Sequence, residues 1–396
     1  MPFVLYLLGL AVFAQGTSEF MLSGLIPDIA RDLQVSIPAA GSLTSAFAVG
    51  MVLGAPLMAV MSMRWSRRRA LLTFLIVFLL VHVVGALTSD YGVLLATRVV
   101  AALANAGFLA VALSTAAAVA PPNAKGRATS ILLAGITLAC VAGAPGGAVL
   151  GQLWGWRSAF WAVVLLSAPA VVAVLKWVPD GTPGSAGPGV RGELRVLRAR
   201  RPMVLLLLCA LVNGGTFCTF TYLAPLITGV SRLGSVWVPV VLALFGVGSL
   251  IGVTVSGRLS DARPVPLLLT GGTALLVGWG VLALTAGSPV AAISLVMLQG
   301  ALSFAVGSTL VSQVLYSAAG APALSGASAT AAFNVGAALG PALGGVAIGA
   351  GLGYRSPLWV SGLMVALALA VALTAMASGR ARGGVRGPRA EGAATP

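Results

Sequence analysis

The sequence predicts an all-α membrane protein of twelve transmembrane helices, arranged as two parallel six-helix repeats. Three observations predict this class: an apolar composition, the regular recurrence of long apolar runs, and a sequence echo between the two halves of the chain. Apolar residues make up 59% of the 396 residues and charged residues only 8%. Soluble domains carry about 25% charged residues. This chain cannot build a water-facing surface, and it belongs in a bilayer.

Apolar runs that are long enough to span a bilayer, which takes about 20 residues, recur twelve times. The predicted spans are 3–26, 40–62, 70–87, 91–118, 128–151, 158–178, 203–227, 236–256, 266–286, 290–318, 326–350 and 357–377. The first span is not expected to be a cleaved signal peptide. Its leading residues MPFVLY contain no basic side chain, and the apolar run is too long for a signal-peptide core.

The basic residues fall on one side of these spans. With the N-terminus inside, eighteen of the 23 basic residues lie in cytoplasmic segments, four lie in outer loops, and Arg98 lies within a span. This bias is the positive-inside rule, and it predicts that both termini are cytoplasmic. The net charge of +15 therefore needs no nucleic-acid partner to explain it.

The echo between the halves indicates a duplication. GWRSAFW at 155–161 returns as GYRSPLW at 353–359, an offset of 198 residues, and Pro27 returns as Pro225 at the same offset. Because each half holds an even number of spans, the halves are parallel repeats that can enclose a cavity and rock about it. The predicted organisation is an N-terminal bundle (1–178), a cytoplasmic linker (179–202), a C-terminal bundle (203–378) and a disordered basic tail (379–396).

The linker itself has two open interpretations. Its first part, PDGTPGSAGPGVRG, is too rich in proline and glycine for a packed helix. Its second part, ELRVLRARR, is either a short basic amphipathic stretch on the lipid surface or a solvated segment with orienting charges.

Two glycine-rich segments correspond in the two halves, GITLACVAGAPGGAVLG (135–151) and NVGAALGPALGGVAIG (334–349). Close helix packing would explain either segment alone. Together with the repeat, they resemble the antiporter motif G-P-x-x-G-G of drug exporters in the major facilitator superfamily, which implies the major facilitator fold. The residues singled out by this resemblance are Gly143, Pro145, Gly147, Gly151, Gly340, Pro341, Gly344 and Gly345.

The loop motif of that superfamily, G-x-L-a-D-r-x-G-r-[RK], is also present in part. GRLSD at 257–261 matches its front, and MSMRWSRRRALL at 61–72 keeps its basic end but lacks the expected Gly, Asp and Gly. The resemblance implies cytoplasmic gating loops that involve Arg67, Arg68, Asp261 and Arg263.

The stretch GTSEFMLSGLIPDIARDLQVSIPAAG (16–41) is most similar to twelve-span drug:proton antiporters, and within them to actinomycete chloramphenicol resistance exporters. Leu94 followed by Arg98 resembles the start of a superfamily motif whose arginine is tied to proton coupling. The resemblance implies a monomer that handles a small drug molecule and protons, with no cofactor.

Glu19 is the one acidic residue of eight that lies well inside a predicted span, and at the repeat offset its counterpart is Phe217. A carboxylate at this depth is expected to be protonated, paired or lining a wet cavity. Burial disfavours its charged form and a nearby arginine favours it, so such a group can take up a proton from one side and release it to the other. Arg98 is the natural counter-charge. A static Glu19–Arg98 pair that locks helices together is the alternative.

Helical spacing supplies candidate cavity residues around this pair. Gln15 and Ser23 share the face of Glu19, and Asn105 lies two turns from Arg98. In the seventh span, amide and aromatic side chains suit a neutral aromatic ligand; they are Asn213, Phe217, Phe220 and Tyr222. For each of these residues taken alone, packing is the favoured explanation over a site role. The sole histidine, His82, cannot form a metal site by itself, and packing is favoured over proton shuttling for it.

The sequence contains no phosphate-binding G-x-x-x-x-G-K-[ST] loop, no Ser/His/Asp set and no His/Cys cluster. An ATP motor, an enzyme, a metal and a cofactor are therefore not expected. The predicted function is proton-coupled efflux of a small amphiphilic antibiotic, of which chloramphenicol is the favoured example, by a monomer in the bacterial cell membrane. The alternatives are export of a sugar or other metabolite on the same fold, and a non-transporting membrane receptor or channel.

Overall fold

The computed structural model describes residues 3–62, 65–119, 125–178, 196, 198–260, 263–318 and 322–384. Within these ranges every regular element is a helix, and twelve helical segments are long and apolar enough to cross a membrane. The predicted class, an all-α membrane protein with twelve spans, is confirmed.

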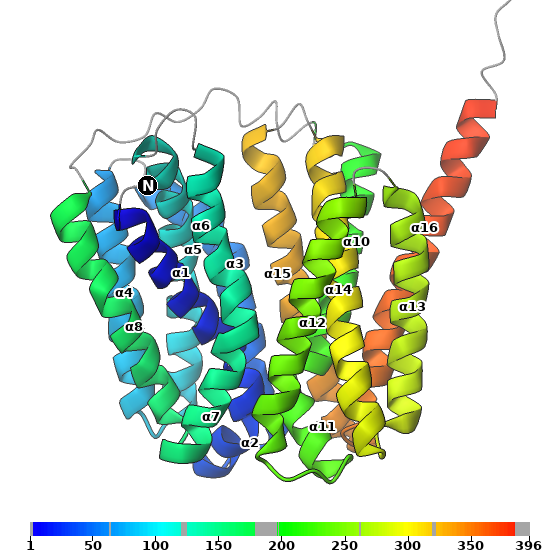
Figure 1. Ribbon diagram of the computed structural model, residues 1–396, viewed down its shortest axis with the longest axis horizontal. Coiled ribbons are helices and arrows are strands. Elements are labelled where there is room, and N and C mark those ends of the chain that lie inside the picture. Colours follow the sequence, from blue (N-terminus) through cyan, green and yellow to red (C-terminus); the bar gives the residue numbers. More distant parts are fainter. Residues whose placement is uncertain are drawn as a thin grey trace, which may run out of the picture.

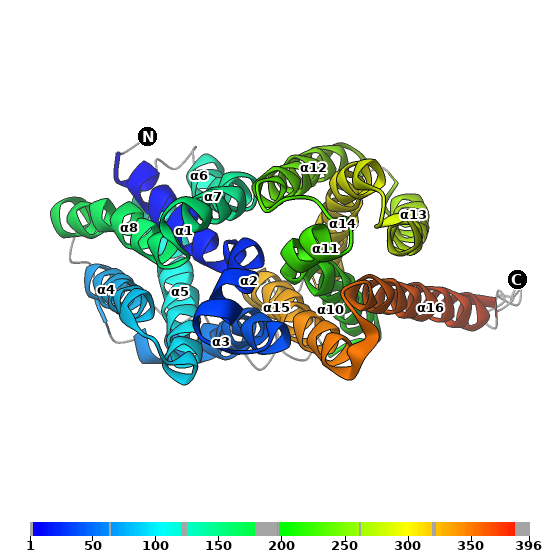
Figure 2. The same cartoon turned by 90° about the horizontal axis from the view of Figure 1, so that it is seen from below.

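The two halves lie side by side, with α1 to α8 on one side and α10 to α16 on the other (Figures 1 and 2). The helices of the first half are α1 (Phe3–Phe20), α2 (Leu22–Asp32), α3 (Ile37–Ser62), α4 (Arg67–Leu87), α5 (Tyr91–Val119), α6 (Lys125–Leu138), the π-helical turn η1 (Ala139–Gly143), α7 (Ala144–Trp154) and α8 (Arg157–Trp177). Those of the second half are α10 (Arg200–Thr221), α11 (Leu223–Gly229), α12 (Trp237–Leu259), α13 (Pro264–Thr285), α14 (Pro289–Ser317), α15 (Pro322–Ala347), the π-helical turn η2 (Ile348–Leu352) and α16 (Ser356–Gly384).

The repeat seen in the sequence is also visible in the helices. α5 and α14 are each 29 residues long and begin 198 residues apart. The start of α1 and the end of α16 lie at the same end of the bundle (Figure 1), as an even number of spans requires. We call this end the terminal side, and the other end the far side.

Three spans that the sequence predicts as continuous are interrupted. The first breaks at Met21 between α1 and α2, the seventh breaks at Tyr222 between α10 and α11, and the fifth contains η1 before α7. Pro145 lies in the first turn of α7. It has no N–H for the carbonyl of Val141, four residues earlier, so the regular helical bonding is lost within η1.

α16 continues to Gly384, so residues 379–384 are helical and not part of a disordered tail as expected. Residues 379–384 read GRARGG, and three glycines in six residues disfavour helix, so intrinsic propensity does not account for this extension of α16. The remainder of the predicted tail and most of the predicted linker fall outside the described residues.

Glycines let the motif helices approach α1, α2 and α10 closely. In the first half Gly143, Gly147 and Gly151 lie against Thr17, Met21 and Leu25, and in the second half Gly340 and Gly344 lie against Gly214 and Cys218. None of the five leaves room for a Cβ atom. The glycines predicted from the antiporter motif therefore hold helices together at spacings of four residues.

Candidate functional site

Arg98, Ser18 and His82 form a buried polar cluster between α1, α4 and α5. Arg98 is 1% exposed, and it donates from Nη1 to Ser18 Oγ at 2.7 Å and from Nη2 to the Ser18 carbonyl at 2.7 Å. Its guanidinium also lies over the ring of Phe47, with Cζ 4.5 Å from the centroid. Two hydrogen bonds and a cation–π contact hold the planar head group in one orientation.

The hydrogen bonds of His82 extend this cluster in one direction. Its Nδ1 lies 2.7 Å from the Phe78 carbonyl, which can only accept, so Nδ1 carries the hydrogen. In the neutral ring Nε2 is then the acceptor for the Ser18 hydroxyl, 2.6 Å away. A continuous series of hydrogen bonds therefore runs from Arg98 through Ser18 and His82 to the Phe78 carbonyl. The packing predicted for His82 is present, against Phe78 and Phe160, but the polar role of its ring was missed.

Glu19 follows Ser18 in α1 and is half-buried. Successive helical residues point about 100° apart. Ser18 faces α4 and α5 and Phe20 faces α10, so Glu19 lies on the part of the α1 surface between these two contacts. No hydrogen bond or ion pair to its carboxylate occurs among the described residues. In this structure the hydrogen bonds of Arg98 go to Ser18 and not to Glu19, so the two residues are not joined as an ion pair among the described contacts. Proton coupling through Glu19 and Arg98 stays a prediction.

Gln15 and Ser23 lie on the same helical face as Glu19. Gln15 is 1% exposed, and neither its Oε1 nor its Nε2 has a hydrogen-bond partner among the described residues. Buried polar groups are nearly always paired, so an unpaired amide one turn from Glu19 indicates a place where a polar partner binds. Ser23 is different, because its hydroxyl donates to the Phe20 carbonyl within the helix.

Aromatic rings cross from the first half to the second directly beside Glu19. The Phe20 ring lies 6.0 Å from Phe217 and 6.2 Å from Phe220, and Phe220 continues to Phe245 at 4.8 Å. Phe217 and Phe220 were predicted as cavity residues, and that role stays a prediction. The sequence analysis did not predict that Phe20 and Phe245 contact them, because nothing in the sequence pairs α1 or α12 with a particular turn of α10.

The two candidate asparagines lie apart from these rings. Asn105 donates to the sulfur of Met51 on α3 at 3.5 Å, and Asn213 donates to the Phe333 carbonyl on α15 at 2.7 Å. Both amides therefore join neighbouring helices within one half, and the structure does not bring them together.

Tyr222 was predicted as a cavity residue, and the structure places it between the two halves, directly after the end of α10 at Thr221. A contact with substrate stays a prediction. Its ring fits between Gly41 of α3 and Gly345 of α15, and its hydroxyl donates to the Pro341 carbonyl at 2.9 Å. Tyr222 thus fills the seam between the two halves.

Further contacts close the seam from its middle toward the far side. Ser45 donates to the Ala338 carbonyl at 2.8 Å, and Gln152 at the end of α7 donates to the Ser235 carbonyl at 2.6 Å. With Tyr222, these hydrogen bonds and close packings join the halves across the far end of the bundle.

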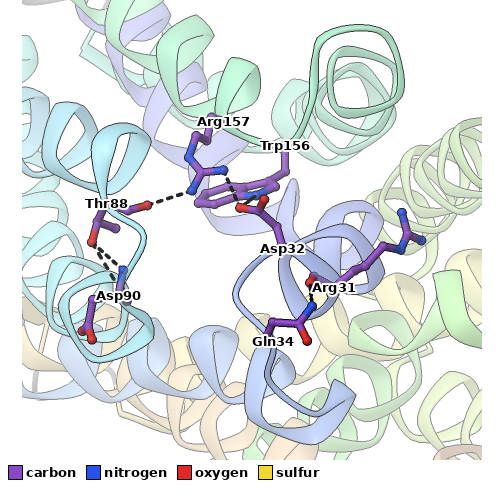
Figure 3. Close-up of polar contacts among 7 residues, drawn as sticks. All are labelled: Arg31, Asp32, Gln34, Thr88, Asp90, Trp156 and Arg157. Atoms are coloured by element: carbon purple, nitrogen blue, oxygen red, sulfur yellow. Dashed lines mark hydrogen bonds and ion pairs between the residues drawn. The ribbon is translucent and has the colours of Figure 1, made fainter.

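Polar contacts at the far side tie α2 to α8 (Figure 3). Asp32 forms an ion pair with Arg157 and accepts a hydrogen bond from Trp156 Nε1 at 3.1 Å. Arg157 also donates to the Thr88 carbonyl at 3.0 Å. The hydrogen bond from Arg157, and after it the one from Trp156, hold the pKa of Asp32 below its ordinary value.

The predicted gating residues are only partly described. Arg67 and Arg68 open α4, and Arg263 precedes α13 as an exposed side chain. Asp261 lies outside the described residues, so gating through this loop stays a prediction. The described residues also contain no group of three His, Cys, Asp or Glu side chains that could hold a metal.

Comparison with known proteins agrees with this architecture. The family model of the Major Facilitator Superfamily matches residues 8–330. A chloramphenicol resistance protein of Streptomyces lividans is 56% identical over 375 residues, which cover 94% of this chain and 96% of that protein. The inner membrane transport protein YdhP of Escherichia coli K12 is 38% identical over 91% of this chain and 93% of that protein.

A solved structure has the same fold. The inward-facing, occupied structure of a bacterial homologue of the human lysosomal transporter Spinster superposes with a TM-score of 0.76, at 19% identity, over 94% of this chain and 96% of that one. The chain belongs to the major facilitator superfamily. It is a multi-pass membrane transporter of a bacterium.

Proposed function

We propose that the protein is a proton-driven exporter of a small, neutral, amphiphilic antibiotic of the chloramphenicol type. The observation that carries the proposal is Glu19: a half-buried carboxylate with no hydrogen-bond partner among the described residues, beside an arginine that is fixed in place. A carboxylate in this setting can exchange a proton without first breaking an ion pair.

The drug class follows from the surroundings of Glu19 and from the relative. The ring of Phe20, which follows Glu19 in the sequence, packs with those of Phe217 and Phe220 at the seam, and the buried Gln15 amide has an unused donor and acceptor. This combination suits an aromatic ligand with a few polar groups. The 56% identical relative is named for chloramphenicol resistance, which supports the same substrate class here.

The orientation in the membrane follows from charge. The excess of basic residues on the segments of the terminal side supports a cytoplasmic location of that side. The contacts that join the halves at the far side support an inward-facing state, in which drug enters from the cytoplasm or the inner leaflet. Protonation of Glu19 from outside favours drug release there, and loss of the proton inside resets the carrier.

The driving force is sufficient for resistance. One charge moving down a membrane potential yields about 2.3 kcal/mol per 100 mV, and one pH unit adds about 1.4 kcal/mol. One proton per drug molecule can therefore sustain a drug gradient of roughly a few hundred-fold.

Drug uptake into everted membrane vesicles tests the proposal. An imposed pH gradient should drive chloramphenicol uptake by the wild type and by the control Asp90→Asn, which alters an exposed loop carboxylate. Glu19→Gln should lose this uptake. If Glu19→Gln pumps normally, Glu19 is not the coupling site. Uptake of sugars but not of drugs would favour a metabolite exporter, and no flux of either by the wild type would favour a receptor.

A further inference from the structure

A cavity of about 540 Å³ lies in the second half of the protein, away from the seam. It is enclosed by α10, α13, α14 and α16, and its wall is almost wholly apolar. Residues that represent the four helices are Val204, Leu208, Leu268, Leu310, Ala368 and Leu369. A volume of this size is typical of cavities that hold a small-molecule ligand.

The outer wall of this cavity faces lipid. α13 and α16 pack against helices of their own half, and at the level of the cavity they carry exposed apolar side chains, Val265, Leu367 and Leu373. α16 leans outward toward its C-terminal end (Figures 1 and 2). The cavity therefore lies beside the acyl chains of the bilayer, not on the path between the halves.

Positive charge is concentrated at one end of the cavity only. Arg200 and Arg201, in the first turn of α10, line its mouth on the terminal side and are exposed. Arg200 Nη2 donates to Ser378 Oγ of α16 at 2.6 Å, which holds the guanidinium across the mouth. No carboxylate lines the cavity. The end with the arginines is the end where lipid phosphates of the inner leaflet lie, in the proposed orientation.

We propose that this cavity binds an anionic glycerophospholipid of the inner leaflet. Arg200 and Arg201 contact the phosphate, and an acyl chain lies along α10, α13, α14 and α16. Basic pockets between membrane helices on the cytoplasmic side suit such head groups, and the apolar wall suits a hydrocarbon chain. A peptide would leave its backbone polar groups unpaired in this wall, and a neutral drug would make no use of the two charges.

The proposal is independent of the substrate and of proton coupling. It predicts a lipid that stays with the protein through purification and that is selected by charge.

Native mass spectrometry of the purified full chain, offered phosphatidylglycerol or phosphatidylcholine in mixed micelles, tests the proposal. The wild type should retain phosphatidylglycerol at least tenfold better than phosphatidylcholine. The double variant Arg200→Gln/Arg201→Gln should lose this preference. Ala368→Phe, which fills the cavity, should reduce retention of both lipids. The matched control Arg258→Gln removes an exposed arginine that lies at the same end but does not line the cavity, and it should behave as wild type.

Three results would overturn the proposal. Equal retention of the two lipids by the wild type would mean that charge is not recognised. If the double variant still preferred phosphatidylglycerol, Arg200 and Arg201 would not bind the lipid phosphate and would serve only to set the orientation of the protein in the membrane. Displacement of bound phosphatidylglycerol by chloramphenicol would make the cavity a drug site. The arginine variants change exposed side chains and should fold as the wild type does. Gel filtration checks this, so that a loss of lipid can be attributed to the site and not to unfolding.

Discussion

The two halves of the molecule share a frame and differ in chemistry. Both use glycines spaced four residues apart to pack the antiporter-motif helix against the first helix of the half. In the first half, however, the middle of the bundle holds Glu19, His82 and Arg98. The positions 198 residues further on are, in the same order, Phe217, Gly280 and Val296. Helix packing has preserved the repeat, whereas the buried charges occur once.

The difference shows what a buried charge requires. Arg98 is tolerated because Ser18 supplies two acceptors, Phe47 supplies a ring face, and His82 takes the hydroxyl hydrogen of Ser18. Val296 is 2% exposed, and no carboxylate occurs in the described part of its half. In the proposed mechanism one coupling site serves one proton, and a second buried charge would add the cost of desolvation without a function.

Exchanging the residues of this comparison should give the largest effect. Val296→Arg places an unpaired guanidinium in the second half and should cost about 3 kcal/mol or more, seen as a lower yield of monodisperse protein and a lower Tm. The reciprocal change Arg98→Val leaves the bond between Ser18 and His82 intact, so the protein should fold but lose pH-driven uptake. Wild-type stability of Val296→Arg would show that the second half also offers a charge site.

The fold was predictable from the sequence because composition and periodicity are local. Twelve apolar runs, an offset of 198 residues and one carboxylate within a span were enough for the architecture and for Glu19. The hydrogen-bond partners of Arg98 and His82 were not predictable. Ser18 meets His82 across 64 residues and Arg98 across 80, and no single-sequence pattern encodes such contacts. Tyr222 was predicted from its aromatic character, which does not show that its ring packs between α3 and α15.

The shared packing gives a second, smaller test of the comparison. In Gly340→Ala the new Cβ meets the backbone carbonyl of Gly214, whereas in Gly143→Ala it meets the side chain of Thr17. Backbone atoms cannot move aside without separating the helices, so Gly340→Ala should cost about 2–3 kcal/mol and Gly143→Ala about 1–2 kcal/mol. Tm measurements on purified protein would rank them.

A compensating change separates the two glycines further. Thr17→Ala removes the hydroxyl, which is the atom nearest to the new Cβ, and should restore part of the stability of Gly143→Ala, whereas the atoms nearest to the new Cβ in Gly340→Ala are backbone atoms that no substitution removes. Equal losses in both variants, with no recovery in the double variant, would contradict the difference between the two contacts.

His82 is expected to matter for rate more than for folding. His82→Phe keeps a ring against Phe78 and Phe160 but removes the acceptor of the Ser18 hydroxyl. A lost hydrogen bond of about 1–1.5 kcal/mol should slow pH-driven uptake roughly tenfold and shift its pH profile. His82→Gln, whose amide can still accept, should recover part of the rate. Wild-type rate and pH profile in His82→Phe would restrict His82 to packing.

The smallest effect is expected at the far side, where the halves again differ. Arg157 pairs with Asp32, whereas Arg355, 198 residues on, has no carboxylate partner in the described part of the chain. The pKa of Asp32 is lowered by Arg157 and then by Trp156, so its contribution to stability is present above the unfolded value of about 3.9 and is lost as the pH falls through the lowered folded value.

Asp32→Asn should therefore lower the Tm by about 2 °C at pH 6, because the pair is partly exposed and contributes less than about 1 kcal/mol. The difference from wild type should shrink as the pH is taken from 5 toward 3, since the wild-type carboxyl then becomes neutral as well. Arg355→Gln, the matched change in the second half, should leave the Tm unchanged at either pH. If the Tm difference for Asp32→Asn persisted undiminished at pH 3, the contact between α2 and α8 would depend on the hydrogen bonds of Asp32 and not on its charge.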